Sequence, residues 1–318
     1  MTFEAVDRYV APTQLRQALA LLAQPGGATV LAGGTDLMPQ AQAGRLKPAR
    51  TLLNIRRIAE LDGVRLDEGS ERNPAHGPAP ALVLGALVTM TRLRRDPLVR
   101  AHAPLLAEAA EHFASEQIRN TATLGGNLCN ASPAGDTLTP LLALDAEVEL
   151  VRLADDGTVL ARRLPIGAFF TGPGRAARGA DELLGAVRVP VAAPGAVIRI
   201  AVGTGTGTGT VWRFHKGGTR PALDISPIAI ALVAARGADG LLGGVRIALG
   251  AVAPTPMRAQ RAEALLEGRR LDAGLAAAAA EAAAAECRPI DDVRASAWYR
   301  RELVRNMLQR MLDDVAQA

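Results

Sequence analysis

A run of proline and alanine ending in glycine, near residue 190, divides this chain into two stretches with different patterns. The run reads Pro190-Val191-Ala192-Ala193-Pro194-Gly195. Such a composition is typical of linkers, because proline and glycine interrupt helices and strands alike. With 318 residues, the chain is long enough for two domains of about 150 residues each. We therefore expect one domain before this break and a second domain after it.

Before the break, short apolar runs alternate with helical patterns. Apolar residues from Leu15 to Leu22 recur at helical spacing, which predicts a helix over residues 13–24 with Thr13 as its N-cap. The sequence Asp155-Asp156-Gly157 lies between two apolar runs and predicts a hairpin turn. Strands are expected at residues 28–32, 51–55, 81–84, 148–153 and 183–189, and further helices at residues 105–113 and 138–144.

After the break, the expected strands come first and the helices follow. Strands are predicted at residues 197–202, 225–235 and 245–252, and helices at residues 257–267, 271–286 and 293–312. Separate runs of strands and helices favour an α+β domain. The tract Gly203–Thr210 alternates glycine and threonine, and we expect a loop there.

The composition argues against several classes of protein. Hydrophobic residues make up 49% and charged residues 21% of the chain, which is typical of a globular protein. The net charge is +4, but the basic residues are scattered singly and in pairs and are not interleaved with aromatic residues. Binding of nucleic acid is therefore not expected. Lysine occurs only at Lys47 and Lys216.

Metal sites and membrane segments are not expected either. The two cysteines, Cys129 and Cys287, and the four histidines show no spacing typical of metal ligands. The first residues lack the charged lead and apolar core of a signal peptide. The alanine-rich run at residues 275–285 is too short to span a bilayer and contains Glu281. We expect a cytoplasmic protein without a membrane span.

Two segments contain paired glycines. They are Val30–Leu37, directly after a predicted strand, and Thr121–Leu128. Paired glycines let the backbone approach a ligand and turn its amides outward, which suits a pyrophosphate. Neither segment has the Gly-Lys-[Ser/Thr] of a P-loop or the Gly-x-Gly-x-x-Gly of a Rossmann fold, and the lack of lysine favours the internal pyrophosphate of a dinucleotide. Each segment alone is equally consistent with a tight turn.

Three single residues each allow two interpretations. Asp136 either caps the helix expected at residues 138–144 or accepts hydrogen bonds from ribose hydroxyls. Lys216 is either a surface residue or a cation near the N1–C2=O region of a flavin, where it would stabilise the anionic reduced form. Cys129, beside the second glycine segment, is expected to be a small buried apolar residue rather than a functional thiol.

The two glycine segments resemble the FAD-pyrophosphate loops of the molybdenum hydroxylase flavoproteins. These are the medium subunits of bacterial carbon monoxide, xanthine, nicotinate, caffeine and aldehyde dehydrogenases, and the same module lies inside eukaryotic xanthine dehydrogenase. The resemblance runs nearly from end to end, in the order of the family. It rests on Leu31–Leu37, Ala122–Asn127, Ala131–Asp136, Phe169–Gly174, Glu182–Leu184, Lys216–Arg220 with Asp224-Ile225, Leu249–Pro256, Glu263–Gly268, and Asp291–Ser296 with Tyr299-Arg300.

This resemblance implies an α+β fold with two domains. Residues 1–178 would form a two-lobed FAD-binding domain of the vanillyl-alcohol-oxidase (PCMH) type, with lobes at about residues 1–57 and 58–178. Residues 194–305 would form the C-terminal domain of the carbon monoxide dehydrogenase flavoproteins, a small antiparallel sheet with helices.

The resemblance also implies the residues that hold FAD. Phe113 matches an aromatic residue at the cofactor, and Asp136 matches the aspartate that binds the ribose. Leu184 and Lys216 match residues beside the isoalloxazine ring, and no side chain is expected to act as a catalytic acid, base or nucleophile. The pyrophosphate would be held by Thr29, Val30, Leu31, Ala32, Gly33, Gly34, Thr35 and Asp36, together with Thr123, Leu124, Gly125, Gly126 and Asn127.

In this family the flavin subunit transfers electrons and does not oxidise the organic substrate. A large molybdopterin subunit oxidises the substrate, and a small subunit with two two-iron clusters relays the electrons to FAD. The flavin passes them to NAD, a quinone or another acceptor. The resemblance therefore implies a heterotrimeric complex in which this chain carries FAD alone.

Two features of this chain depart from the family. Relatives that reduce aromatic acyl-CoA thioesters carry a four-iron cluster on a cysteine-bearing insertion, which this chain lacks, so no cluster is expected. The Gly–Thr tract before Lys216 is unlike the family and leaves the place of Lys216 near the flavin open.

Three alternatives to an electron-transfer subunit stay open. They are a stand-alone FAD-dependent oxidase, an accessory protein that has lost FAD, and a binding protein without a cofactor.

Overall fold

The first part of the chain forms a small parallel sheet. The computed structural model describes residues 6–69, 80–191, 209–220 and 223–317. In this sheet the strand order is β1-β3-β2, with β1 at Arg8–Val10, β2 at Thr29–Leu31 and β3 at Thr51–Asn54. Helix α1 (Leu15–Leu22) follows β1, and helix α2 (Leu37–Gln42) follows β2. The helix and strands expected here are confirmed, with ends shifted by one or two residues.

Helix α1 packs because its apolar residues share one face. Ala18, Leu19 and Leu22 are buried on that face. The expected cap at Thr13 is wrong, since Gln14 is the N-cap and makes no side-chain cap bond. Instead Glu60, in the short 3₁₀ helix η1 (Ala59–Leu61), accepts the amide hydrogen of Leu15 at 3.2 Å. A carboxylate distant in sequence thus satisfies one of the free amides at this helix start.

An antiparallel sheet of five strands carries the second lobe. Its order is β4-β5-β10-β6-β7, so β10 lies at the centre, and its residues 183–189 are all buried. The hairpin between β6 and β7 turns at Gly157, which has a φ of +79°. The expected turn is confirmed. The strands are β4 (Val64–Asp67), β5 (Ala81–Gly85), β6 (Glu147–Leu153), β7 (Val159–Pro165) and β10 (Leu183–Pro190).

Short helices cover this sheet and form the main hydrophobic core with it. The core includes Leu82, Leu106, Leu124 and Leu141. The helices are α3 (Met90–Arg95), α4 (Pro97–His102), α5 (Pro104–Glu111), α6 (Glu116–Arg119), α7 (Leu124–Asn130), α8 (Leu138–Ala143) and α9 (Ile166–Phe169), and a small hairpin joins β8 (Phe170–Gly172) to β9 (Arg175–Ala176).

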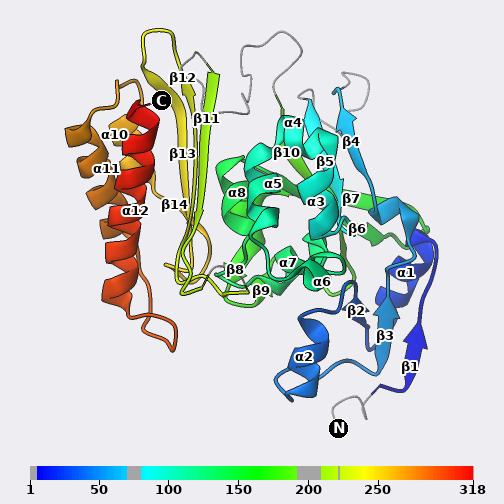
Figure 1. The fold of residues 1–318 in the computed structure, drawn as a ribbon. Helices are drawn as coiled ribbons and strands as arrows, with labels where there is room; N and C mark the ends of the chain where they lie inside the picture. Colours follow the sequence, from blue (N-terminus) through cyan, green and yellow to red (C-terminus); the bar gives the residue numbers. More distant parts are fainter. Residues whose placement is uncertain (1–5, 70–79, 192–208, 221–222, 318) are drawn as a thin grey trace.

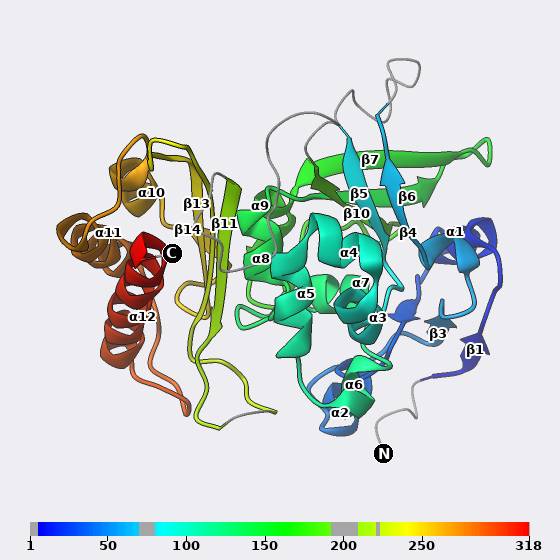
Figure 2. The same ribbon diagram turned by 45° about the horizontal axis from the view of Figure 1, so that its top comes forward.

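The last part of the chain forms a four-stranded antiparallel sheet with three helices. Figures 1 and 2 show this sheet between helices α10–α12 on one face and α8 on the other. The strands are β11 (Gly209–Lys216), β12 (Ala229–Arg236), β13 (Leu242–Gly250) and β14 (Met257–Arg258), and the helices are α10 (Gln260–Leu266), α11 (Ala273–Glu286) and α12 (Ala297–Gln317). The strands-then-helices order predicted for this domain is confirmed, and no described helix is long and apolar enough to cross a membrane.

Three local expectations for this part were wrong or incomplete. Residues 257–258 form strand β14, so the helix expected from residue 257 begins at Gln260. The last helix begins at Ala297 rather than residue 293. Residues 209–210, at the end of the Gly–Thr tract, begin strand β11, which was not predicted, and the strand expected at 197–202 lies outside the described residues.

The C-terminal sheet separates two hydrophobic cores, and strand β11 faces both of them. Val211 packs with the core under helices α10–α12, whereas Trp212 and Phe214 pack against the core of the first domain. Successive side chains of a strand point to opposite faces. Lys216 therefore shares the face of Trp212 and Phe214, which is the face turned toward the first domain.

Candidate functional site

The two glycine segments lie against each other. Gly33 and Gly34 follow β2, and Gly34 has a φ of +73°. A Cβ atom on Gly33 would lie 2.2 Å from the carbonyl oxygen of Thr121, which begins the second segment. Only glycine permits this approach. The absence of a side chain at residue 33 thus brings together two segments that are almost ninety residues apart.

The first segment offers free backbone amides. Within the described part of the chain, the amides of Gly33, Gly34, Thr35 and Asp36 donate no hydrogen bond to another residue. Gly33, Gly34 and Thr35 are half-buried, so part of each residue stays accessible to a ligand. Consecutive free amides attract an anion such as a pyrophosphate. This geometry fits the role predicted for residues 33–36.

The second segment differs from the expectation. The amide of Leu124 donates to the Val88 carbonyl at 2.9 Å, and that of Gly125 to the Ala86 carbonyl at 2.8 Å. The amides of Gly126 and Asn127 both donate to Thr123, which caps helix α7. The predicted outward amides are therefore wrong here, because the helix start and the neighbouring backbone already use them.

Glycine in this second segment serves close packing. A Cβ atom on Gly125 would lie 2.7 Å from the Cβ atom of Ala86. Gly126 is exposed, and Asn127 is half-buried. Any contact of this segment with a cofactor would use the surface at Gly126 and the side chain of Asn127.

Asn127 links this segment to the region around Asp136. Its Oδ1 atom accepts a hydrogen bond from the Thr137 hydroxyl at 2.7 Å. The N-cap of α8 is Thr137, which makes no side-chain capping bond, so the interpretation of Asp136 as the helix cap is wrong. Asp136 instead accepts a hydrogen bond from Lys216 Nζ at 2.7 Å.

The Asp136–Lys216 pair is buried. Each side chain is 9% exposed, which also rules out the interpretation of Lys216 as a surface residue. Lys216 Nζ donates a second hydrogen bond, at 2.9 Å, to the His112 carbonyl. Burial raises the pKa of Asp136 to about 6, and the charge of Lys216 opposes that rise. The pair crosses from strand β11 of the C-terminal domain to the first domain.

One oxygen of Asp136 has no partner. Its Oδ1 atom is buried and accepts no hydrogen bond among the described residues. Buried polar atoms in native proteins are almost always satisfied by protein, water or ligand. A hydroxyl group of a ligand is a suitable donor. This unpaired oxygen is the feature of the site that fits a sugar-bearing cofactor.

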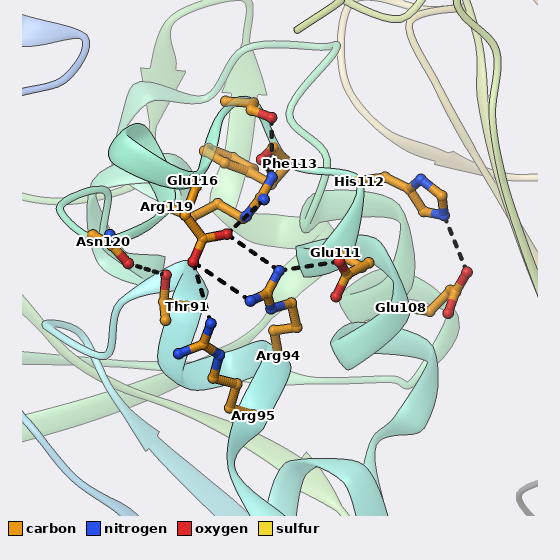
Figure 3. A network of polar contacts seen from close by, with 11 residues as sticks. Thr91, Arg94, Arg95, Glu108, Glu111, His112, Phe113, Glu116, Arg119 and Asn120 are labelled. Atoms are coloured by element: carbon orange, nitrogen blue, oxygen red, sulfur yellow. Dashed lines mark hydrogen bonds and ion pairs between the residues drawn. The ribbon is translucent and has the colours of Figure 1, made fainter. Parts of the chain in front are cut away.

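The turn that carries Phe113 is held by an arginine. Arg119 donates to the carbonyl oxygens of Phe113 at 2.6 Å and Ala114 at 3.0 Å, and Ala114 has a φ of +38°. Figure 3 shows the surrounding network, in which the Glu116 carboxylate contacts Arg119 and two further arginines, Arg94 and Arg95. The network fixes the residues that separate α5 from α6.

This turn borders a cavity of about 310 Å³. His112, on its wall, pairs with Glu108 at 3.0 Å, and this hydrogen bond raises the pKa of His112. The carbonyl oxygen of His112 accepts a hydrogen bond from Lys216, so the wall of the cavity is connected to the Asp136–Lys216 pair. The cavity is lined by Glu111, His112, Ala114, Ser115, Glu116, Arg119 and Leu223.

Leu184 lies apart from these polar groups. It is 4% exposed in strand β10 and belongs to the main hydrophobic core, against which Phe113 also packs. The ladder between β10 and β6 is irregular between Leu184 and Ala186. No described polar contact joins Leu184 to Lys216, so its place beside a flavin stays a prediction.

Sequence reasoning missed Gln40 as a link between the segments. Its side chain donates to Asp36 and, at 3.5 Å, to Asn130. The spacing of Asp36 and Gln40, four residues apart at the start of α2, was a signal for the first of these contacts. The second contact depends on tertiary structure.

The described residues include no group of three or more potential metal ligands. Cys129 packs against the main core, and burial raises the pKa of its thiol to about 11. Cys129 is half-buried, so its predicted place as a small buried residue is met only in part.

Comparisons with known proteins identify the family. Residues 2–192 match the family described as the FAD binding domain in molybdopterin dehydrogenase. The chain belongs to the FAD-binding medium subunits of the molybdenum hydroxylases. Residues 213–315 match the C-terminal domain of the carbon monoxide dehydrogenase flavoproteins. The resemblance read from the glycine segments is thus confirmed, together with the two-domain α+β fold, the FAD cofactor and the assignment as an oxidoreductase subunit.

Individual relatives span almost the whole chain. The xanthine dehydrogenase FAD-binding subunit of Escherichia coli O157:H7 is 32% identical over 96% of this chain and 94% of that protein. The carbon monoxide dehydrogenase medium chain of Hydrogenophaga pseudoflava is 33% identical over 96% of this chain and 95% of that protein. A solved structure of that dehydrogenase, lacking the Mo-pyranopterin moiety, matches with a TM-score of 0.83 and 33% identity over 98% of this chain and 97% of that chain.

Proposed function

We propose that this chain is the electron-transfer subunit of a heterotrimeric molybdenum hydroxylase. It would receive electrons from a small iron–sulfur subunit, hold FAD, and pass them to NAD or another acceptor, while a large molybdopterin subunit oxidises the substrate. The observation that carries this proposal is the unpaired Oδ1 atom of Asp136, buried beside Lys216. The relatives described as medium chains or FAD subunits support the assembly.

FAD, when bound, supplies the two-electron redox chemistry, and the side chains hold and tune it. The free amides of residues 33–36 would donate to the pyrophosphate. We also propose cofactor contacts for Thr29–Ala32, Phe113 and Leu184, and for Thr123–Asn127 through the exposed surface at Gly126 and the side chain of Asn127.

The ion pair restricts the roles of Asp136 and Lys216. Their charged atoms are 2.7 Å apart, so both must act at neighbouring parts of the cofactor. If Lys216 acts beside the isoalloxazine ring, Asp136 accepts from a hydroxyl close to that ring. The ribityl chain carries such hydroxyls. Lys216 would then contribute positive charge that favours the anionic reduced flavin.

The decisive experiment is the visible spectrum of the purified chain, with analysis of the nucleotide released by acid. We expect flavin absorption and release of FAD rather than FMN. A colourless chain that also fails to take up added FAD, alone or with its partner subunits, would contradict the proposal.

Two substitutions localise the site. Asp136→Asn and Lys216→Met should weaken FAD retention, because each removes one member of the buried pair. Lys47→Met, at the only other lysine, and Asp314→Asn on the exposed side of α12 are matched controls that should retain FAD normally.

The alternative of a stand-alone oxidase is tested by mixing the chain with organic substrates in the absence of other subunits. Reduction of the flavin under these conditions would favour it. The C-terminal half contains one histidine, His215, and burial lowers its pKa. No observation favours this alternative.

We keep two further predictions as proposals. One is the division into domains at residues 1–178 and 194–305. The other is a cytoplasmic location, which fractionation of cells that produce the protein would test.

A further inference from the structure

Helix α8 is joined to the C-terminal sheet by ion pairs at both of its ends. Asp136 lies just before the helix and pairs with Lys216 of β11 at 2.7 Å. Asp145 lies just after it and pairs with Arg246 of β13 at 2.6 Å and Arg258 of β14 at 2.8 Å. Two carboxylates of the first domain thus pair with three basic side chains of the second domain.

Between these ends the two domains are in close contact. A Cβ atom on Gly250 would lie 2.8 Å from the Thr139 side chain, so the strand approaches the helix closely. The Ala251 amide donates to the Pro133 carbonyl at 2.8 Å. Closely packed surfaces of this kind shift as a unit. A change in the docking of the sheet would therefore move the segment that carries Asp136.

Asp145 is held in a geometry that suits this bridge. Its φ is +50°, in the left-handed region, which places its carboxylate at the end of α8 beside β13 and β14. Arg258 is fixed from the other side by Glu263, at 2.5 Å, and Glu263 also accepts the Ile247 amide hydrogen. The bridge therefore joins α8 to a cation that is itself anchored within the C-terminal domain.

We propose that Asp145 is a positioning residue for the cofactor site. Through Arg246 and Arg258 it docks the C-terminal sheet on α8, and this docking keeps Lys216 and Asp136 in their places. The inference rests on the proposed function, because it assumes that Asp136 and Lys216 contact FAD. Asp145 itself does not touch the Asp136–Lys216 pair through any described contact.

The test is a titration of the purified full-length apoprotein with FAD, in which the fluorescence of the added FAD reports binding. Asp145→Asn removes the charge and keeps a residue that tolerates the left-handed region. We expect it to raise the dissociation constant roughly three- to tenfold, as for the loss of coupled contacts. Glu281→Gln, which removes an exposed carboxylate paired with Arg305 inside the C-terminal domain, is the matched control and should leave it unchanged.

A double-mutant cycle separates positioning from a general loss of stability. If Asp145 acts through Lys216, Asp145→Asn should have little further effect on the dissociation constant once Lys216→Met is present. Full additivity of the two effects would overturn the proposal. Hydrogen exchange should also become faster at α8 in Asp145→Asn and stay as in the wild type in Glu281→Gln.

The outcomes distinguish this inference from the proposed function. A wild-type chain that binds FAD while Asp145→Asn binds it equally well would overturn the inference alone. A wild-type chain that binds no FAD, alone or with its partner subunits, would overturn both. If Asp145→Asn does not fold, Arg246→Gln removes one of the two bridges from the other side, and the same comparison with Glu281→Gln decides.

Discussion

Gly33 contacts the backbone of Thr121 so closely that an ideal Cβ atom on residue 33 would lie 2.2 Å from the Thr121 carbonyl oxygen. This contact joins the two glycine segments, one from each lobe of the first domain. The two segments can form one site only while this contact between Gly33 and Thr121 is intact.

Gly33→Ala should therefore separate the segments and abolish FAD retention. We expect a loss of about 1–3 kcal/mol in the free energy of unfolding, the usual cost of overpacking. Gly63→Ala is the control, because a Cβ atom there meets nothing within 4 Å. Chemical denaturation and FAD titration of both variants check this. Normal FAD binding by Gly33→Ala would show that the contact is dispensable.

The Asp136 carboxyl should give FAD binding and stability opposite dependences on pH. Burial raises its folded-state pKa from 3.8 to about 6. Asp136 is therefore protonated more readily in the folded apoprotein than in the unfolded chain. This difference stabilises the fold fully below pH 3.8, and the stabilisation is lost as the pH rises through about 6. If FAD uses the carboxylate as an acceptor, as proposed, its affinity should instead fall as the pH drops below about 6.

Titrations of FAD and thermal unfolding of the apoprotein, both between about pH 5 and 8, measure the two trends. Asp136→Asn should flatten both. A wild-type FAD affinity that does not change across this range, or that rises toward low pH, would contradict the assigned role of Asp136.

Arg119→Met should displace the turn that carries Phe113. The substitution removes two hydrogen bonds to the carbonyls of Phe113 and Ala114. We expect a loss of roughly 2 kcal/mol in the free energy of unfolding and weaker FAD binding. Arg95→Met is the control, because Arg95 contacts the same Glu116 carboxylate but is 64% exposed. Equal stability of the two variants would argue against this role of Arg119.

Arg300→Met should destabilise the C-terminal domain. The guanidinium is 3% exposed and donates to the carbonyls of Pro227 and Ala251 and to Asp292. Removing it leaves two buried carbonyl oxygens without a donor, at a cost of about 1–3 kcal/mol each. Asp292 loses one partner but keeps its hydrogen bonds from the amides of Arg294 and Ala295. Thermal unfolding checks this, with the exposed neighbour Arg301→Met as the control. A melting temperature as high as that of Arg301→Met would refute it.

Local patterns predicted many of the longer elements correctly, whereas short ones such as β1, α3 and α6 were not predicted. Helix α1 and strands β2, β3, β5, β6 and β10 were found because their apolar periodicity is undisturbed. Strand β11 was missed, since a Gly–Thr tract and mixed polar and aromatic residues hide its alternation. The N-cap at Thr13 was wrong because the amide of Leu15 is satisfied by Glu60, 45 residues away.

The sequence by itself determined the family and the two-domain fold, because these depend on residue types in a fixed order. Only the tertiary structure decided how they act. It showed that the amides of the second glycine segment are already bonded and that Asp136 pairs with Lys216, 80 residues away. Such pairings depend on how β11 docks against α8, and local sequence carries no information on contacts between distant segments.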